Sequence, residues 1–126
     1  MTREQIAMNK KTSPEVLEQL SNDGYWEVRA NVANNPNTPP KTLDKLSNDT
    51  HEEVRERVAL NRSTSTETLE KMWNDGDQSV RLAIAKNPKT STETLAKMVS
   101  DEDWDVRFAI VMNLLAKLRA QEKQSN

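Results

Sequence analysis

Cysteine is absent from the chain, and histidine occurs once, as His51. The lack of cysteine excludes disulfides, cysteine nucleophiles, thiolate metal sites and iron–sulfur clusters held by thiolates. A lone histidine is a poor basis for a metal site or a nucleophile–base pair, and no phosphate-binding loop occurs. From these residues we expect no catalytic residue, no metal and no cofactor, and hence no enzyme.

Apolar and aromatic residues are also scarce. Hydrophobic residues make up 34% of the chain against 30% charged residues, and the aromatics are three tryptophans, one tyrosine and one phenylalanine. No apolar run approaches the roughly 20 residues of a membrane span, and the start, MTREQIAMNKK, lacks the apolar stretch of a signal peptide. We therefore expect a soluble cytoplasmic protein without membrane contact. A composition with so few hydrophobic residues suits a stack of thin helical layers better than a globular domain with one large core.

What the chain does have is an internal repeat of 26 residues without a single insertion. The complete units read EVRANVANNPNTPPKTLDKLSNDTHE, EVRERVALNRSTSTETLEKMWNDGDQ and SVRLAIAKNPKTSTETLAKMVSDEDW. Such periodicity makes disorder improbable and predicts one repeat domain over residues 1–126. We expect repeat copies at about 2–26, 27–52, 53–78 and 79–104, followed by a C-terminal capping helix at 105–123.

Each unit contains two helical segments. In the first, apolar residues at i, i+4 and i+5, such as Val28, Val32 and Ala33, predict an amphipathic α-helix of about two turns. An asparagine follows at Asn35 and its equivalents, often with proline after it. Asparagine tolerates a left-handed C-cap and proline cannot continue a helix, so the first helix should end there.

The second segment should begin at a repeated threonine. Thr12, Thr64 and Thr90 each precede a glutamate by three residues, which predicts a capping box. In the second copy Pro39 follows Thr38, where we expect it at the first helical position. Apolar anchors at i and i+3, such as Leu43 with Leu46, fit either a brief α-helix or a 3₁₀ segment, and the spacing alone leaves both open.

The ends of the chain differ from the internal copies. Thr2 replaces the repeated valine, and Leu114 replaces the turn residue after the last asparagine, so the final helix can run on. A solenoid needs a terminal element with a polar back, and this helix should supply it. Its expected packed face consists of Val106, Ile110, Val111, Leu115 and Leu118.

The string VRxxVAxNPxTPxxTLxxLSxD, at Val28 to Asp49, closely resembles the leucine-rich repeat variant (LRV) family. The resemblance extends through Asn113 and implies an all-α, right-handed α-solenoid, a superhelix of two-helix repeats alternating α and short 3₁₀ helices. It favours the 3₁₀ option for the second segment. HEAT-like repeats are also similar and would make both segments full α-helices. The cysteine-bound iron–sulfur cluster of a founding LRV member cannot be carried over, because this chain has no cysteine.

A row of arginines is the feature most easily mistaken for a phosphate site. Each of these arginines follows an aspartate by six residues, so we expect a structural ladder of Asp–Arg pairs between segments. The residues of this ladder are Arg29, Arg55, Arg81 and Arg107 with Asp23, Asp49, Asp75 and Asp101.

The tryptophans are the best candidates for a partner-binding surface. Trp26 and Trp104 share one repeat position, and Trp73 takes a position where two other copies have serine. Because these positions tolerate polar residues, we expect the rings to lie outside the deep core. Partial packing over a loop is the slightly favoured interpretation, and the alternative is a set of exposed interface anchors. Variable pairs on the first helices form a second candidate surface: Ala30/Asn31, Glu56/Arg57, Leu82/Ala83 and Phe108/Ala109.

Together these patterns predict a non-catalytic repeat scaffold for protein–protein interaction, of unknown partner and oligomeric state. The alternative is a nucleic-acid-binding, HEAT-like solenoid. A net charge of −2 and the absence of a basic run make nucleic acid the less favoured partner.

Overall fold

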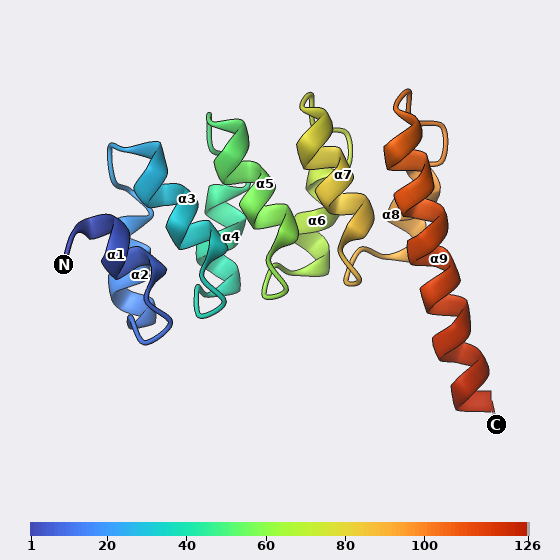
Figure 1. Cartoon of the computed structure of the whole chain (residues 1–126), viewed down its shortest axis with the longest axis horizontal. Helices are drawn as coiled ribbons and strands as arrows, with labels where there is room; N and C mark the ends of the chain where they lie inside the picture. The colour runs from blue at the N-terminus through green and yellow to red at the C-terminus, as the bar shows by residue number, and fades with distance from the viewer. Residues whose placement is uncertain (126) are drawn as a thin grey trace.

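The computed structural model describes residues 1–125 and folds them into nine α-helices without a β-strand (Figure 1). The helices are α1 (Arg3–Met8), α2 (Pro14–Leu20), α3 (Trp26–Asn34), α4 (Pro40–Leu46), α5 (Glu52–Leu60), α6 (Thr66–Met72), α7 (Gln78–Lys86), α8 (Thr92–Lys97) and α9 (Trp104–Ser125). From α3 onward, every first helix begins 26 residues after the one before it. The predicted all-α repeat solenoid is therefore confirmed.

The helices form two layers along the stack. The odd-numbered helices lie side by side, each in contact with the next, and the even-numbered helices lie behind them (Figure 1). Each even-numbered helix packs against the first helix of the following repeat. Neighbouring repeats therefore share one continuous core.

The repeated apolar residues form that core. The valines at Val28, Val54, Val80 and Val106 are at most 1% exposed, and the leucines at Leu17, Leu43, Leu69 and Leu95 are fully buried. Small alanines lie where successive first helices meet: Ala7, Ala33, Ala59 and Ala85 are all 0% exposed. A side chain this small allows two helices to approach closely, so a few residues per layer exclude water without bulky aromatics.

The second segments are α-helices, which settles the alternative that the spacing left open. In α2 the amide of Leu17 donates to the carbonyl of Ser13 at 3.0 Å, an α-helical i→i−4 bond. The final turn is tighter, because the amide of Ser21 is shared between Leu17 and Glu18 at 3.0 and 3.2 Å. The 3₁₀ geometry favoured by the family resemblance is thus restricted to the helix end.

The capping-box prediction for the second helices is wrong by one residue. In α6 the N-cap is Ser65, whose Oγ accepts the amide of Thr68 at 3.1 Å, and Glu67 falls one position early for a capping box. Thr64 instead donates its hydroxyl to the carbonyl of Val58 at 2.6 Å. A fully buried hydroxyl requires a partner, and Thr64 shares the Val58 carbonyl with the amide of Asn61, which donates to it at 3.2 Å.

Two other terminal predictions are also corrected. In the second copy, Pro39 is the N-cap and Pro40 takes the first helical position. The asparagine C-caps are extended: Asn35 has φ −74° and ψ 124°, and no residue in the described range has a positive φ. The extended geometry directs the asparagine side chain toward the preceding repeat, where it has a structural role described below.

Helix α9 continues beyond the stack, as expected, but its apolar residues do not share one face. Val106 and Ile110 are buried in the core, whereas Val111, Leu115 and Leu118 are 54%, 39% and 54% exposed. Five residues along a helix correspond to a rotation of about 140°, so Val111 points away from Val106. In internal repeats the equivalent alanine is covered by the next first helix, whereas among residues 1–125 no further helix follows α9 to cover Val111 (Figure 1).

We expect Ser65→Ala to lower the free energy of unfolding by about 1 kcal/mol, because the substitution removes the N-cap of α6. Urea unfolding followed by circular dichroism measures the change. The matched control is Ser100→Ala, an exposed serine outside any helix, which should stay within about 0.5 kcal/mol of the parent chain. Equal effects of the two substitutions would contradict the assignment of Ser65 as N-cap.

Candidate functional site

The repeated asparagines connect consecutive repeats. In Asn35, Nδ2 donates to the carbonyls of Ala7 and Asn9 at 2.8 and 2.9 Å, and Oδ1 accepts the amide of Asn37 at 2.9 Å. The same pattern recurs in the following repeats. We call this set the asparagine ladder: Asn35, Asn61, Asn87 and Asn113. In all four residues Nδ2 is engaged by two carbonyls of the preceding repeat, and in Asn35, Asn61 and Asn87 Oδ1 also accepts a backbone amide, so these donors are not available to a ligand.

The arginines also link repeats, with a register that differs from the predicted one. Arg55 binds the carboxylate of Asp75, with Nε at 2.9 Å from Oδ2 and Nη2 at 3.2 Å from Oδ1. Its Nη1 donates to the backbone carbonyl of Asp49 at 2.9 Å. The carboxylate partner therefore lies twenty residues later, and the aspartate six residues before the arginine contributes only its main chain. Its own carboxylate already pairs with Arg29 of the preceding repeat.

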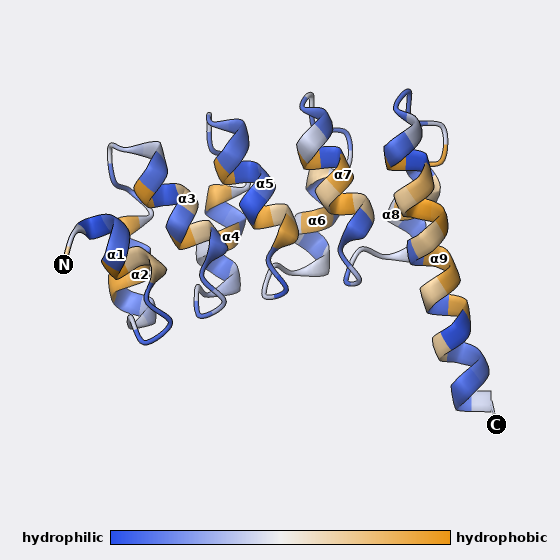
Figure 2. Cartoon of the chain, in the orientation of Figure 1, coloured by the Kyte–Doolittle hydropathy of each residue, from blue (hydrophilic) through white to orange (hydrophobic). Residues whose placement is uncertain are grey.

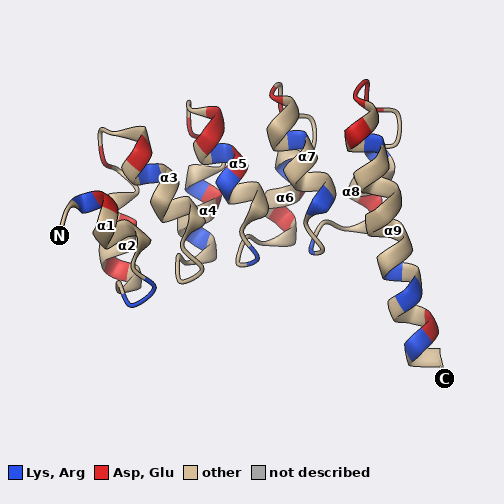
Figure 3. Cartoon of the chain, in the orientation of Figure 1, with Lys and Arg blue, Asp and Glu red and all other residues tan. Residues whose placement is uncertain are grey.

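We call Arg29, Arg55 and Arg81 the arginine ladder; Figure 3 shows basic residues at matching places along α3, α5 and α7. The hydrogen bonds that Arg55 donates to the carboxylate of Asp75 raise the pKa of Arg55, although partial burial opposes this shift. Burial would raise the pKa of Asp49, but hydrogen bonds from Arg29 and from the amide of His51 outweigh it and lower that pKa. With their guanidinium groups engaged in this way, these three arginines do not form a free phosphate-binding row.

Arg107 occupies the next position along the ladder. Its Nη1 donates to the carbonyl of Asp101 at 2.6 Å, as the pattern requires. Within residues 1–125, however, no carboxylate pairs with it. The guanidinium of Arg107 is therefore exposed beside α9 with capacity for a further acceptor.

The three tryptophans lie in different settings. Trp26 is half-buried and stacks on His51, with ring centroids 3.9 Å apart and planes 11° apart. Trp73 is half-buried with Lys97 Nζ 6.0 Å from its ring centroid, whereas Trp104 is 71% exposed. Trp26 begins α3 and Trp104 begins α9, at distant points of the stack (Figure 1). The predicted set is thus not one surface.

His51 has a structural role that sequence reasoning missed. It is the N-cap of α5, where its Nδ1 accepts the amide of Glu53 at 3.1 Å. Its ring covers one face of Trp26, which accounts for the partial burial of that tryptophan. The sequence could have indicated this contact, because His51 follows Trp26 by 25 residues. That spacing is close to the 26-residue period and places the two rings in adjacent repeats.

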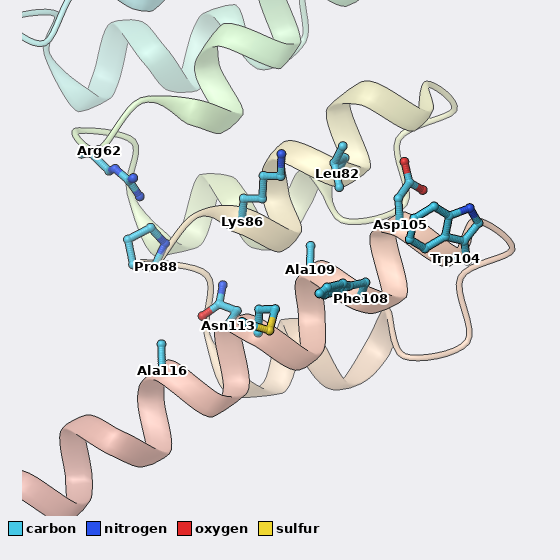
Figure 4. Close-up of a pocket in the computed structure, with 11 residues that line it drawn as sticks. Arg62, Leu82, Lys86, Pro88, Trp104, Asp105, Phe108, Ala109, Asn113 and Ala116 are labelled. Carbon is cyan, nitrogen blue, oxygen red and sulfur yellow. The ribbon is translucent and has the colours of Figure 1, made fainter.

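An open groove of about 600 Å³ lies between α7 and α9 (Figure 4). It is lined by Arg62, Leu82, Lys86, Pro88, Trp104, Asp105, Phe108, Ala109, Met112, Asn113 and Ala116. Three of its apolar side chains are strongly exposed: Trp104 at 71%, Phe108 at 49% and Met112 at 49%. Solvent-exposed apolar side chains gathered in one concave site are typical of binding surfaces.

The two ends of the groove differ in charge. Arg62 and Pro88 lie at one end, Trp104 and Asp105 at the other, and Lys86 lies between Arg62 and Leu82 (Figure 4). In the described chain neither Arg62 nor Lys86 forms an ion pair. Asp105, by contrast, accepts Gln78 Nε2 at 2.9 and 2.8 Å. The groove therefore combines an apolar middle with two free cationic groups toward one end.

The variable pairs that were predicted to form a second surface do not lie together: some of their members are buried, and others line the groove. Ala30 and Ala83 are buried, at 5% and 2% exposure, and belong to the core. Leu82 and Phe108 line the groove from its two sides. The sequence signal for the groove was the placement of Phe108 four residues after Trp104 on one helix, which sets both rings on one face.

The arrangement defines an all-helical repeat scaffold, and comparisons with known proteins agree. Residues 26–51 match the family described as leucine rich repeat variant. A solved structure described as "a leucine-rich repeat variant with a novel repetitive protein structural motif" is 30% identical with a TM-score of 0.71. The match covers 87% of this chain and 45% of that one, so this chain spans less than half of its relative. These matches support an assignment of the chain to the leucine-rich repeat variant family.

Three further findings are negative. No curated protein matches the chain significantly. Within residues 1–125 no helix is both long and apolar enough to cross a bilayer. The same residues contain no group of three or more His, Cys, Asp or Glu side chains arranged to hold a metal ion.

We expect Asn61→Ala to lower the free energy of unfolding by about 2–3 kcal/mol, since it removes three hydrogen bonds and takes the side-chain donor from the carbonyl of the buried Ala33. The matched control is Asn9→Ala. Asn9 has the same repeat position, but its side chain makes only the local bond to Lys11, so a loss of about 0.5–1 kcal/mol is expected. Urea unfolding of both variants tests the difference, and equal losses would show that the inter-repeat bonds contribute nothing.

Stability should fall in acid because the pKa of Asp49 is lowered in the folded chain. A carboxyl with a depressed folded pKa contributes stability above its unfolded pKa, near 4, and loses it as the pH falls through the folded value. We therefore expect the urea midpoint of the parent chain to drop between about pH 5 and pH 2. Asp49→Asn should be less stable at pH 7 and should show a smaller further drop.

The control for the acid series is Glu18→Gln, an exposed residue without an ion pair in the described chain. Its pH dependence should follow that of the parent chain. An acid profile of Asp49→Asn parallel to the parent profile would contradict the role given to the Arg29–Asp49 pair.

Proposed function

We propose that the chain is a protein-binding scaffold that acts without catalysis, and that the groove between α7 and α9 is its docking site. The observation that carries this proposal is the exposure of Trp104, Phe108 and Met112 within one groove. Large aromatic and thioether side chains in a concave site are the usual anchors of protein interfaces. The repeat scaffold provides a fixed frame on which these side chains are held.

The charge of the groove indicates the chemistry of the partner. Arg62 and Lys86 carry no counter-charge within the described residues, whereas Asp105 at the far end is already engaged by Gln78. A partner segment with apolar side chains and a carboxylate near Arg62 would satisfy both features. We therefore propose an apolar segment with an acidic residue toward one end as the bound ligand.

Nucleic acid, the alternative partner, has no comparable support. The arginine ladder is committed to carboxylates and carbonyls of the scaffold itself. The net charge of −2 also gives no attraction for a polyanion. The similar solved structure is described by its repeat motif alone, so the likeness supports the scaffold and adds no partner.

Selection from a random peptide display library tests the proposal, because it samples many candidate ligand sequences at once. We expect enriched peptides to combine apolar residues with Asp or Glu toward one end. Leu82→Glu should reduce their affinity by roughly 100-fold, because it places a charge against the apolar ligand. Glu56 occupies the equivalent position of the third copy, so the fold accommodates glutamate there.

Charge reversal separates groove binding from nonspecific adhesion. Arg62→Glu combined with Lys86→Glu should weaken acidic peptides at least tenfold and favour basic ones. The matched control is Val99→Glu, an exposed apolar residue outside the groove, which should leave binding unchanged. Peptides that bind the parent chain and Leu82→Glu equally well would refute the groove as the docking site.

A further inference from the structure

Helix α9 carries an exposed apolar stripe that the core does not use. Its members are spaced four, three, four and three residues apart and are 39–71% exposed. We call this stripe the α9 seam: Trp104, Phe108, Val111, Leu115 and Leu118. A 4-3-4-3 spacing keeps apolar side chains on one line along a helix and is the pattern by which two long helices pack together.

The seam lies on a face of α9 that the core does not use, and its first two members, Trp104 and Phe108, also border the groove. Val106 and Ile110 face the core at 0% and 1% exposure, and 100° of rotation per residue places Val106 about 200° from Trp104. The helix thus has two apolar faces, one buried and one in water. Apolar colouring on α9 extends past the level at which the other first helices end (Figure 2).

The same face of each internal first helix is already an interface. Ala33, Ala59 and Ala85 share one repeat position with Val111 and are fully buried by the helix that follows. At that position on α9 the alanine becomes a valine that is 54% exposed. The seam therefore continues the stacking surface of the solenoid, with a larger side chain where a covering helix is absent.

A further repeat would not match this surface. An internal first helix such as α7 has nine residues, whereas the seam extends from Trp104 to Leu118, past Asn113 by more than a turn. The asparagine of a further repeat would have to donate to the carbonyls of residues 111 and 113. Because α9 stays helical beyond Asn113, its own i→i+4 bonds occupy these carbonyls, and the asparagine ladder cannot continue there. The seam requires a long helix, and among residues 1–125 only α9 itself, with 22 residues, is long enough.

We propose that two copies of this chain dimerise by pairing their α9 seams in antiparallel orientation. With Val111 opposite Leu115 of the second copy, Phe108 falls opposite Leu118, so apolar side chains meet along the seam. Trp104 and Phe108 belong to both the seam and the groove, but Val111, Leu115 and Leu118 lie outside the groove, so the proposal does not rest on the groove as a docking site.

The charges beside the seam favour this orientation. Near its start α9 carries Asp105 and Arg107, and toward its end Arg119 and Glu122. Antiparallel pairing brings Asp105 near Arg119 of the second copy. Glu122, which continues the seam line four residues after Leu118, falls opposite Trp104 and near Arg107 of the second copy, whereas in-register parallel pairing would set Glu122 against Glu122. Antiparallel pairing also supplies Arg107 with the carboxylate that each member of the arginine ladder has.

Sedimentation velocity of the whole chain over a concentration series tests the dimer. We expect a mass twice 14.4 kDa at the higher concentrations. Leu115→Glu should raise the dissociation constant by roughly 100-fold or more and give a monomer, because it buries a charge in the seam. Val99→Glu is the control and should stay dimeric, and circular dichroism checks that both variants keep their helices. A parent chain that is monomeric throughout, leaving the seam for a helix of another protein, would overturn the proposal.

Disulfide trapping tests the orientation, because the chain has no cysteine of its own. Under oxidation, a mixture of Phe108→Cys and Leu118→Cys chains should yield a crosslinked dimer, while either variant alone should yield little. Crosslinking of each variant with itself would mean parallel helices and would overturn the antiparallel arrangement. The groove variant Leu82→Glu should still dimerise, so failure of the groove and failure of the seam are distinguishable.

Discussion

The close packing of each first helix on the next is the interaction on which the rest of the structure depends. At every internal contact a fully buried alanine lets the helices approach, and the asparagine of the following repeat donates to two carbonyls across the same contact. The apolar area of one layer is small, so its position is set largely by polar groups that must be satisfied. A one-residue slip would rotate an asparagine by about 100° and leave those carbonyls without a donor.

This constraint separates structural residues from residues available for function. Asparagines, arginines and threonines that would attract attention as polar site residues are engaged with neighbouring repeats or with their own helix ends. Binding therefore depends on positions that the period leaves variable. These gather on α9, which no further helix of residues 1–125 covers and on which Trp104 and Phe108 face solvent. The groove and the α9 seam both lie on this helix and share these two side chains.

The sequence predicted the two-helix unit, its period and its core because Val54 or Leu69 needs only its own helix and the adjacent layer to be buried. It erred where one residue had two possible partners. Thr64 could cap its own helix or bind the preceding one, and the second arrangement prevails because the hydroxyl is buried. Arg55 could pair six residues back or twenty residues on, and spacing alone does not reveal which carboxylate is already occupied.

By itself, the sequence determined the class of fold, since a strict 26-residue period with helical spacing admits only a stack of two-helix layers. Only the tertiary structure decided which apolar residues remain in water. Val111 and Ala85 have the same repeat position, yet one is 54% and the other 0% exposed. The difference is whether another helix packs over the side chain, because the burial of a residue depends on its neighbours in the fold as well as on its own hydrophobicity.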